Sequence, residues 1–150
     1  MDEAYRKWLE EGVAGRVVTD MAAGRVIITQ RLAAARDELL IFDPYLGGDP
    51  QEWLVLDRVS CHVRVLTSRK ANVPAGSVPA NVELRVWQGK STPFHDRGYL
   101  WRGGGISVGA SQNGLGGRMF TIDVLEPAVV KRLTDLFNSW WADPLAQPAV

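Results

Sequence analysis

The stretch FHDRGYLWRGGGISVGASQNGLGGRMFTI, residues 94–122, decides how the fold is interpreted. Glycine-rich turns separate short apolar segments, a pattern that predicts adjoining β-strands at 98–101, 105–109 and 119–124. His95 and Arg97 are two residues apart, and side chains at this spacing on a strand face the same side. Ser111 and Asn113 belong to the run Gly-Ala-Ser-Gln-Asn that ends the second segment. The stretch therefore predicts several polar side chains near strand ends.

These four side chains suit a phosphate group. A neutral imidazole can attack phosphorus, a guanidinium can pair bidentately with phosphoryl oxygens, and hydroxyl and amide groups can donate hydrogen bonds to them. The alternative is structural, because a lone strand histidine often serves packing and Ser111 and Asn113 are common turn residues. We interpret the group as a candidate phosphate site, with His95 as its candidate nucleophile.

The residues before this stretch predict a unit of parallel strands. Apolar or alternating runs predict strands at 38–42, 62–66 and 82–87. The first run ends at Asp43, because the following Pro44 cannot donate a further ladder hydrogen bond. Prolines and glycine at 71–81 predict a loop. Asp43 is thus expected at the carboxyl end of a strand, where open α/β sheets bind ligands.

Helical patterns and caps predict helices at 2–11, 20–37, 49–59 and about 126–141. In the third of these, Trp53, Leu54 and Leu56 are expected to turn inward. Residues 142–150 contain two prolines and no periodicity, so they predict a frayed, flexible tail. The expected fold is one α/β domain over 1–141, a mixed β-sheet flanked by helices.

Composition narrows the class of protein. A chain of 150 residues with 46% hydrophobic and 23% charged residues suits a single globular domain. No apolar run is long enough to cross a bilayer and no signal peptide is visible, so a soluble, cytoplasmic protein is expected. One Cys and two His cannot supply an ordinary structural zinc site, so we expect no metal and no cofactor.

The net charge of zero conceals a basic middle segment. Residues 58–118 hold 9 basic and 2 acidic side chains, whereas residues 1–57 hold 6 and 11. A segment this basic is compatible with a phosphodiester ligand such as nucleic acid. The alternative is an ordinary solvated surface, because neighbours in sequence need not form a patch.

At these residues the sequence resembles the phospholipase D superfamily, whose motif is HxKxxxxD followed, after a glycine-rich turn, by a GSxN-like segment. The match consists of His95, Arg97, Ser111 and Asn113, and the following NGLG run resembles small bacterial phospholipase D-like domains. More loosely, IFDPYL and RVLTS resemble the first βαβ unit of those domains. The resemblance covers about two thirds of the chain and implies a single-motif phospholipase D-like domain.

Two positions depart from the motif. Arg97 replaces the lysine and keeps its positive charge, with a geometry suited to bidentate phosphate contacts. Arg102 replaces the aspartate, so the carboxylate that helps to position the catalytic histidines is missing. Arg102 is interpreted as a second phosphate-binding residue or as a solvated hairpin residue. Asp43 is the candidate to replace the lost carboxylate, unless it only caps the turn before Pro44.

The resemblance implies a metal-independent reaction in which one histidine attacks phosphorus and a second protonates the leaving oxygen. Since the chain carries one motif, it implies a homodimer or pairing with another phospholipase D-like domain. Three functions stay open: a phosphodiesterase such as a nuclease, a degenerate module that binds nucleic acid or dimerises, and a purely structural interaction domain. The sequence favours a degenerate or weakly active phosphodiesterase, and the alternative is a catalytically dead dimerisation or interaction module of a larger assembly.

Overall fold

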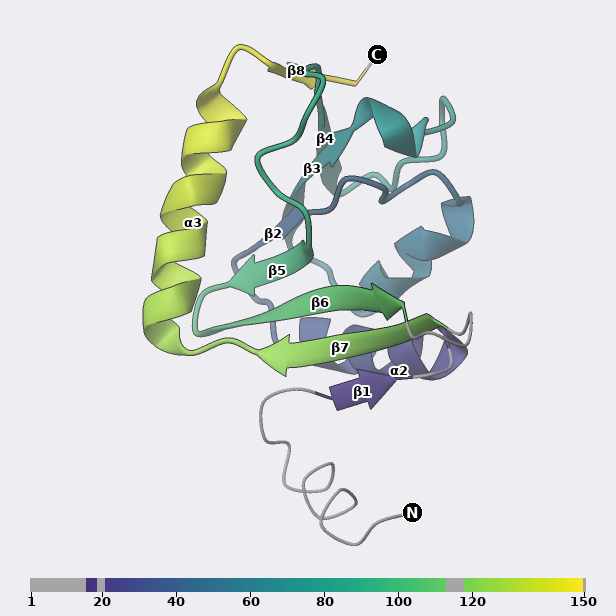
Figure 1. Cartoon of the computed structure of the whole chain (residues 1–150), viewed down its shortest axis with the longest axis vertical. Helices are drawn as coiled ribbons and strands as arrows, with labels where there is room; N and C mark the ends of the chain where they lie inside the picture. Colours follow the sequence, from purple (N-terminus) through teal and green to yellow (C-terminus); the bar gives the residue numbers. More distant parts are fainter. Residues whose placement is uncertain (1–15, 19–20, 113–117, 150) are drawn as a thin grey trace, which may run out of the picture.

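A computed structural model of the chain describes residues 16–18, 21–112 and 118–149 (Figure 1). Within these residues the strands are β1 (Arg16–Val18), β2 (Glu38–Phe42), β3 (His62–Ser68), β4 (Val82–Trp87), β5 (Arg97–Trp101), β6 (Gly104–Gln112), β7 (Arg118–Val124) and β8 (Ala146–Pro148). The helices are α2 (Met21–Leu32) and α3 (Pro127–Ala142), with the 3₁₀ helices η1 (Pro50–Leu56) and η2 (Arg69–Ala71). The helix predicted at 2–11 lies outside the described residues.

The strands form one mixed sheet in the order β1-β7-β6-β5-β2-β3-β4-β8. β2, β3 and β4 are parallel neighbours, and the remaining pairs are antiparallel. The prediction of a mixed sheet flanked by helices is confirmed, and so are the three strands predicted before the motif and the three within it. The strand order also shows that β5 pairs with β2, which the sequence did not indicate.

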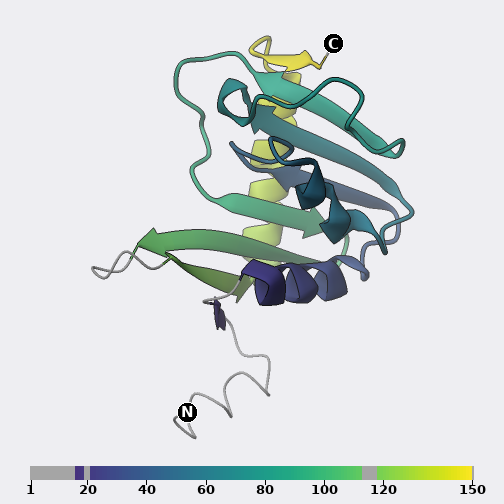
Figure 2. The same ribbon diagram turned by 90° about the vertical axis from the view of Figure 1, so that its right-hand side faces the viewer.

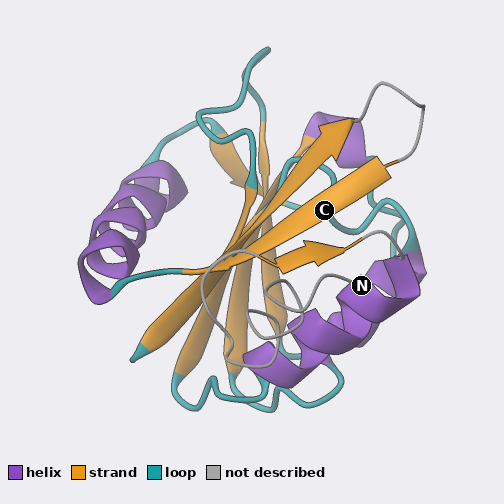
Figure 3. Ribbon diagram, turned by 60° about the horizontal axis from the view of Figure 1, so that its bottom comes forward, coloured by secondary structure: helices purple, strands orange, loops and turns teal. Residues whose placement is uncertain are grey.

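Each face of the sheet carries its own helix, α3 on one side and α2 on the other (Figures 2 and 3). A hydrophobic core lies on each face, and the alternating side chains of β2 contribute to both. Leu39 and Ile41 face α2 and η1, whereas Leu40 and Phe42 face α3. On the second face, Phe137 and Trp141 of α3 are buried, as the helical spacing predicted.

Two predicted helices differ in extent or type. α2 ends at Leu32 rather than near residue 37, because the N–H groups of Ala34 and Ala35 bond to carbonyls three residues back and close the last turn. The helix predicted at 49–59 is the shorter 3₁₀ helix η1. A capping box begins it: the Asp49 carboxylate accepts from the N–H of Gln51, and the Glu52 carboxylate accepts from the N–H of Asp49.

The tighter winding of η1 changes which side chains point inward. Trp53 and Leu56 are buried as predicted, but Leu54 is 52% exposed and Val55 is buried in its place. A 3₁₀ helix has about three residues per turn, so the inward stripe follows a spacing of three. The prediction that Leu54 turns inward was therefore wrong.

The predicted frayed tail was also wrong at residues 146–148. β8 pairs antiparallel with β4, Ala146 is buried, and the N–H of Ala149 donates to the carbonyl of Leu84 at 3.1 Å. Pro144 precedes this short pairing and Pro148 is its last residue, opposite Arg85; both are tolerated because an edge strand needs few ladder donors. The last residues of the described chain thus cover the outer edge of β4.

The ends of β2, β3 and β4 meet at one edge of the sheet, and β5 begins there. We call this the carboxyl edge; it contains Asp43 after β2, Ser68 at the end of β3 and Arg97 at the start of β5. Gly98 pairs with Phe42, and a Cβ at this position would overlap the Phe42 ring. The glycine therefore lets β5 approach β2 closely enough to bring Arg97 beside Asp43.

Candidate functional site

Asp43 occupies the centre of the carboxyl edge and is fully buried. Its N–H donates to the carbonyl of Leu66 at 3.0 Å, which continues the β2–β3 ladder by one residue. Its Oδ1 accepts a hydrogen bond from the N–H of Tyr45 at 2.8 Å, so the carboxylate also caps the turn after β2. The predicted position at a strand's carboxyl end is confirmed.

The second carboxylate oxygen of Asp43 contacts Arg97. Arg97 Nε lies 3.3 Å from Asp43 Oδ2, with 29% of the Arg97 side chain exposed. The contact is ionic rather than a hydrogen bond, because Oδ2 has no hydrogen-bond partner of good geometry among the described residues. Asp43 thus holds Arg97 through Nε, and the two terminal guanidinium nitrogens have no hydrogen bond to the described residues.

Arg97 lines a small hollow with a cavity volume of about 60 Å³, between α2, η1 and the sheet. Arg25 from α2, Glu52 from η1 and Tyr99 from β5 line the same hollow. Sequence reasoning missed these three residues because Arg25 and Glu52 lie outside the motif, Tyr99 occupies one of its unspecified positions, and their elements meet only in the folded chain. Two guanidinium groups facing one cavity can together bind an anionic group.

Burial sets the protonation of the site. It raises the pKa of Asp43 above 3.8, and the charge of Arg97 and backbone N–H groups partly oppose that rise. Burial also raises the pKa of Glu52, and the negative charge of Asp43 adds to this rise. Burial likewise raises the pKa of the Tyr99 phenol, which stays protonated at neutral pH. The hollow therefore becomes more positive as pH falls.

These raised pKa values predict how stability depends on pH. The folded state binds protons at Asp43 and Glu52 that the unfolded state releases, so this contribution is complete below their ordinary values of 3.8 and 4.5. It is lost as pH rises through the raised values, with a slope of at most about 1.4 kcal/mol per pH unit for one proton. Asp43→Asn is expected to flatten this dependence.

Urea unfolding across that pH range, with the wild type and Asp43→Asn side by side, measures the difference. Asp57→Asn is the matched control, since Asp57 is an exposed carboxylate beyond η1. If Asp43→Asn keeps the full wild-type slope, Asp43 does not take up a proton on folding in that range.

His95 lies at the same edge but not on a strand. β5 begins at Arg97, and His95 is an exposed residue of the preceding loop. The prediction that His95 and Arg97 share a strand was wrong, because Phe94 anchors the loop by packing against Phe42 and Trp140, with ring centroids 5.8 and 5.5 Å apart. That anchor leaves His95 exposed, two residues before the first residue of β5.

Arg102 lies at the other end of β5, where it forms an ion pair with Asp37 at 3.6 Å. Both side chains are exposed, at 89% and 65%. The five residues of β5 rise by roughly 3.3 Å each, so Arg102 is on the order of 17 Å from Arg97 along the strand. The structure does not bring Arg102 together with Arg97.

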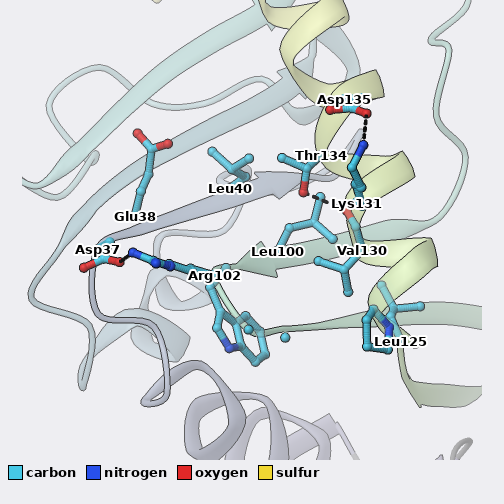
Figure 4. Close-up of a pocket in the computed structure, with 14 residues that line it drawn as sticks. Asp37, Glu38, Leu40, Leu100, Arg102, Leu125, Val130, Lys131, Thr134 and Asp135 are labelled. Atoms are coloured by element: carbon cyan, nitrogen blue, oxygen red, sulfur yellow. Dashed lines mark hydrogen bonds and ion pairs between the residues drawn. The ribbon is translucent and has the colours of Figure 1, made fainter.

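Around Arg102 there is a wider hollow, with a cavity volume of about 450 Å³, which Figure 4 shows between the ion pair and α3. Leu40 and Leu100 lie between the two sides, and Lys131 of α3 pairs with Asp135 at 3.6 Å. The cations of this hollow pair with exposed carboxylates, whereas at the carboxyl edge a fully buried carboxylate holds Arg97 through Nε and leaves its terminal nitrogens without a hydrogen bond to the described residues. We therefore take the carboxyl edge as the candidate site.

The remaining predicted residues fall at the end of β6. Ser111 precedes the last residue of that strand and pairs with Met119 of β7 through the backbone. Asn113 lies outside the described residues. Among the described residues no three His, Cys, Asp or Glu side chains are grouped to hold a metal ion, and no described helix is long and apolar enough to cross a membrane.

Solved structures share this architecture, although no protein-family profile and no curated protein sequence matches the chain. NucT from Helicobacter pylori matches with a TM-score of 0.62 and 7% identity over 90% of this chain and 98% of that chain. Nuc from Salmonella typhimurium, a phospholipase D family member, matches with a TM-score of 0.55 and 11% identity over 91% and 97%. TrmBL2, an archaeal chromatin protein, matches with a TM-score of 0.60 and 14% identity over 91% and 53%.

These matches show the class of fold: the chain is an α/β domain whose mixed sheet is arranged as in phospholipase D family members. The chain has a phospholipase D-like fold, as the motif resemblance implied. It spans nearly the whole of NucT and Nuc, but only 53% of TrmBL2.

Proposed function

We propose that this chain is a phosphodiester-binding domain whose ligand is nucleic acid. The observation that carries the proposal is the fully buried Asp43, which holds Arg97 in a hollow that also contains Arg25. Burying a carboxylate costs free energy unless it pairs with a cation. The Asp43 carboxylate orients the Arg97 guanidinium and leaves the terminal nitrogens of Arg97 available to a ligand. Those nitrogens match the oxygens of a phosphate group in geometry and charge.

Nucleic acid is the ligand that the remaining observations support best. The basic segment at 58–118 includes Ser68 and Arg97 of the carboxyl edge. TrmBL2, which matches in fold, is described for its mode of DNA binding. Phosphate contacts by arginine and lysine read the backbone rather than the bases. We therefore expect binding with little sequence preference, weakened by salt.

Weak, metal-independent cleavage is the catalytic part of the proposal. A nitrogen of His95 would form a bond to phosphorus while the bond to the leaving oxygen breaks, and water would then hydrolyse the phosphohistidine. The proton for the leaving oxygen would come from a second His95, supplied by a homodimer or another phospholipase D-like domain. Ser111 and Asn113 would donate hydrogen bonds to the phosphoryl oxygens.

The alternative is a catalytically dead dimerisation or interaction module within a larger assembly. It is favoured by Arg102, which stands at the position of the motif aspartate and pairs with Asp37, far from Arg97. In this case the fold and the phosphate site would remain while turnover is lost.

The test is to incubate the purified protein with labelled single- and double-stranded DNA and RNA in the presence of a chelator. Binding and cleavage are recorded together, with His95→Ala beside the wild type. Cleavage that disappears in His95→Ala supports the phosphodiesterase, and retained binding without cleavage supports the degenerate module. Absence of binding to all four ligands would overturn the proposed function.

A further inference from the structure

Beside the candidate site, the carboxyl edge carries a second group of cations that no motif includes. The turn after β3 and the loop after β4 enclose a shallow hollow lined by Ser68, Arg69, Lys70, Gly89, Lys90 and Thr92. Arg69, Lys70 and Lys90 are exposed, and none of them forms an ion pair within the described part of the chain. We call these three residues the basic cluster.

The basic cluster is built on the same edge as Asp43 and Arg97. Ser68 ends β3, and its hydroxyl donates to the carbonyl of Pro44 at 2.7 Å, which ties the ends of β2 and β3 together. The same Ser68 oxygen accepts from the N–H of Lys70 at 3.2 Å and so fixes the turn that carries this cation. A short chain of contacts therefore connects Lys70 to the residue that follows Asp43.

Acidic side chains are scarce in the segment that carries this group. Between residues 67 and 95 the sequence contains one acidic residue, Glu83, which lies near the amino end of β4 and so at the opposite edge of the sheet. The next acidic residue, Asp96, is exposed in the loop before β5. The positive charge of the basic cluster is therefore not neutralised by its own segment, and its field is available to a ligand.

The spacing between the two groups indicates the size of that ligand. In the order β5-β2-β3-β4, two to three strand spacings of about 4.8 Å separate the start of β5 from the ends of β3 and β4, or roughly 10–15 Å. A stacked nucleic-acid strand rises about 3.4 Å along its axis per nucleotide, so this distance corresponds to about three or four nucleotide steps of a stacked strand and to fewer of an extended one. A mononucleotide bound at Arg97 would not reach the basic cluster.

We propose that the basic cluster binds the backbone phosphates of a nucleic-acid strand whose other phosphate lies at Arg97. This rests on the proposed function and adds that the substrate is a polynucleotide strand held across the ends of β2, β3 and β4. Lysine ammonium groups act as mobile point charges and carry no base preference, so the cluster provides length dependence rather than sequence specificity.

The test compares Lys70→Gln/Lys90→Gln with Arg36→Gln/Arg58→Gln, a control that also removes two exposed charges but from turns at the amino end of the parallel strands. The probes are a labelled dithymidylate and a long labelled oligothymidylate, and the measurement is affinity by anisotropy at several salt concentrations. The Lys70/Lys90 variant is expected to lose affinity for the long probe only, with a salt slope smaller by about 1.4. The control is expected to keep the wild-type slope.

Three outcomes separate the two proposals. An unchanged slope in the Lys70/Lys90 variant, with binding lost in Arg97→Ala, would overturn the basic cluster and leave the proposed function standing. Equal losses for the short and long probes would also overturn it, because they would mean that the lysines act on the Arg97 site itself. If the wild type binds neither probe, both proposals fail.

Discussion

Replacing Arg97 by alanine is expected to weaken oligonucleotide binding by about 10- to 100-fold, since a hydrogen bond to a charged group contributes roughly 1.5–3 kcal/mol. The variant removes the guanidinium that Asp43 holds at 3.3 Å in the hollow. Arg97→Lys should retain part of the affinity, because it keeps the charge and loses the bidentate geometry. Equilibrium titration of a labelled oligonucleotide measures the effect.

The same substitution is expected to cost stability, because it leaves the fully buried Asp43 without its cation. Removing one partner of a buried pair costs about 3 kcal/mol or more, and the cost should shrink at low pH as the Asp43 carboxyl takes up a proton. The double variant Asp43→Asn/Arg97→Ala should recover stability but not binding, which separates the two roles. Arg97→Ala with native affinity would contradict the role of Arg97 in the site.

Replacing Phe137 by alanine is expected to lower the free energy of unfolding by about 3–5 kcal/mol. The Phe137 side chain is fully buried, stacks on Trp141 with ring centroids 5.6 Å apart, and lies under the Arg64 guanidinium at 5.4 Å. These contacts attach α3 to the sheet, and the cavity left by alanine cannot be filled without moving the helix.

Denaturant unfolding measures this loss, with Val129→Ala as the matched control on the same helix. Val129 is 42% exposed, so its truncation should change stability by no more than about 0.5 kcal/mol. A loss below about 1 kcal/mol for Phe137→Ala would mean that α3 contributes little to the stability of the fold.

The strands and the position of Asp43 could be predicted from the sequence because their signals are local. β2 is an apolar run stopped by proline, so both its end and the residue after it were predictable. β3 and β4 alternate with period two, and α3 begins at Pro127 and repeats its apolar residues at three and four. Such patterns depend on neighbours within one element, which the sequence records directly.

What the sequence did not predict depends on distant partners. Arg25 and Glu52 join Arg97 only because α2 and η1 pack over the same face of the sheet. His95 leaves the strand because Phe94 packs against Trp140, almost fifty residues away. The pairing of β8 with β4 similarly depends on where α3 ends relative to the sheet. No periodicity within residues 142–150 could indicate that position.

The two outermost strands of the sheet, β1 and β8, are each three residues long. They cover the middle of β7 and the end of β4, and the uncovered part of β4 includes the charged, exposed Glu83. Long, flat, apolar edges invite strand addition and aggregation, whereas short or charged edges discourage both. A second copy of this chain is therefore expected to associate through side-chain surfaces rather than by extending the sheet into a continuous ribbon.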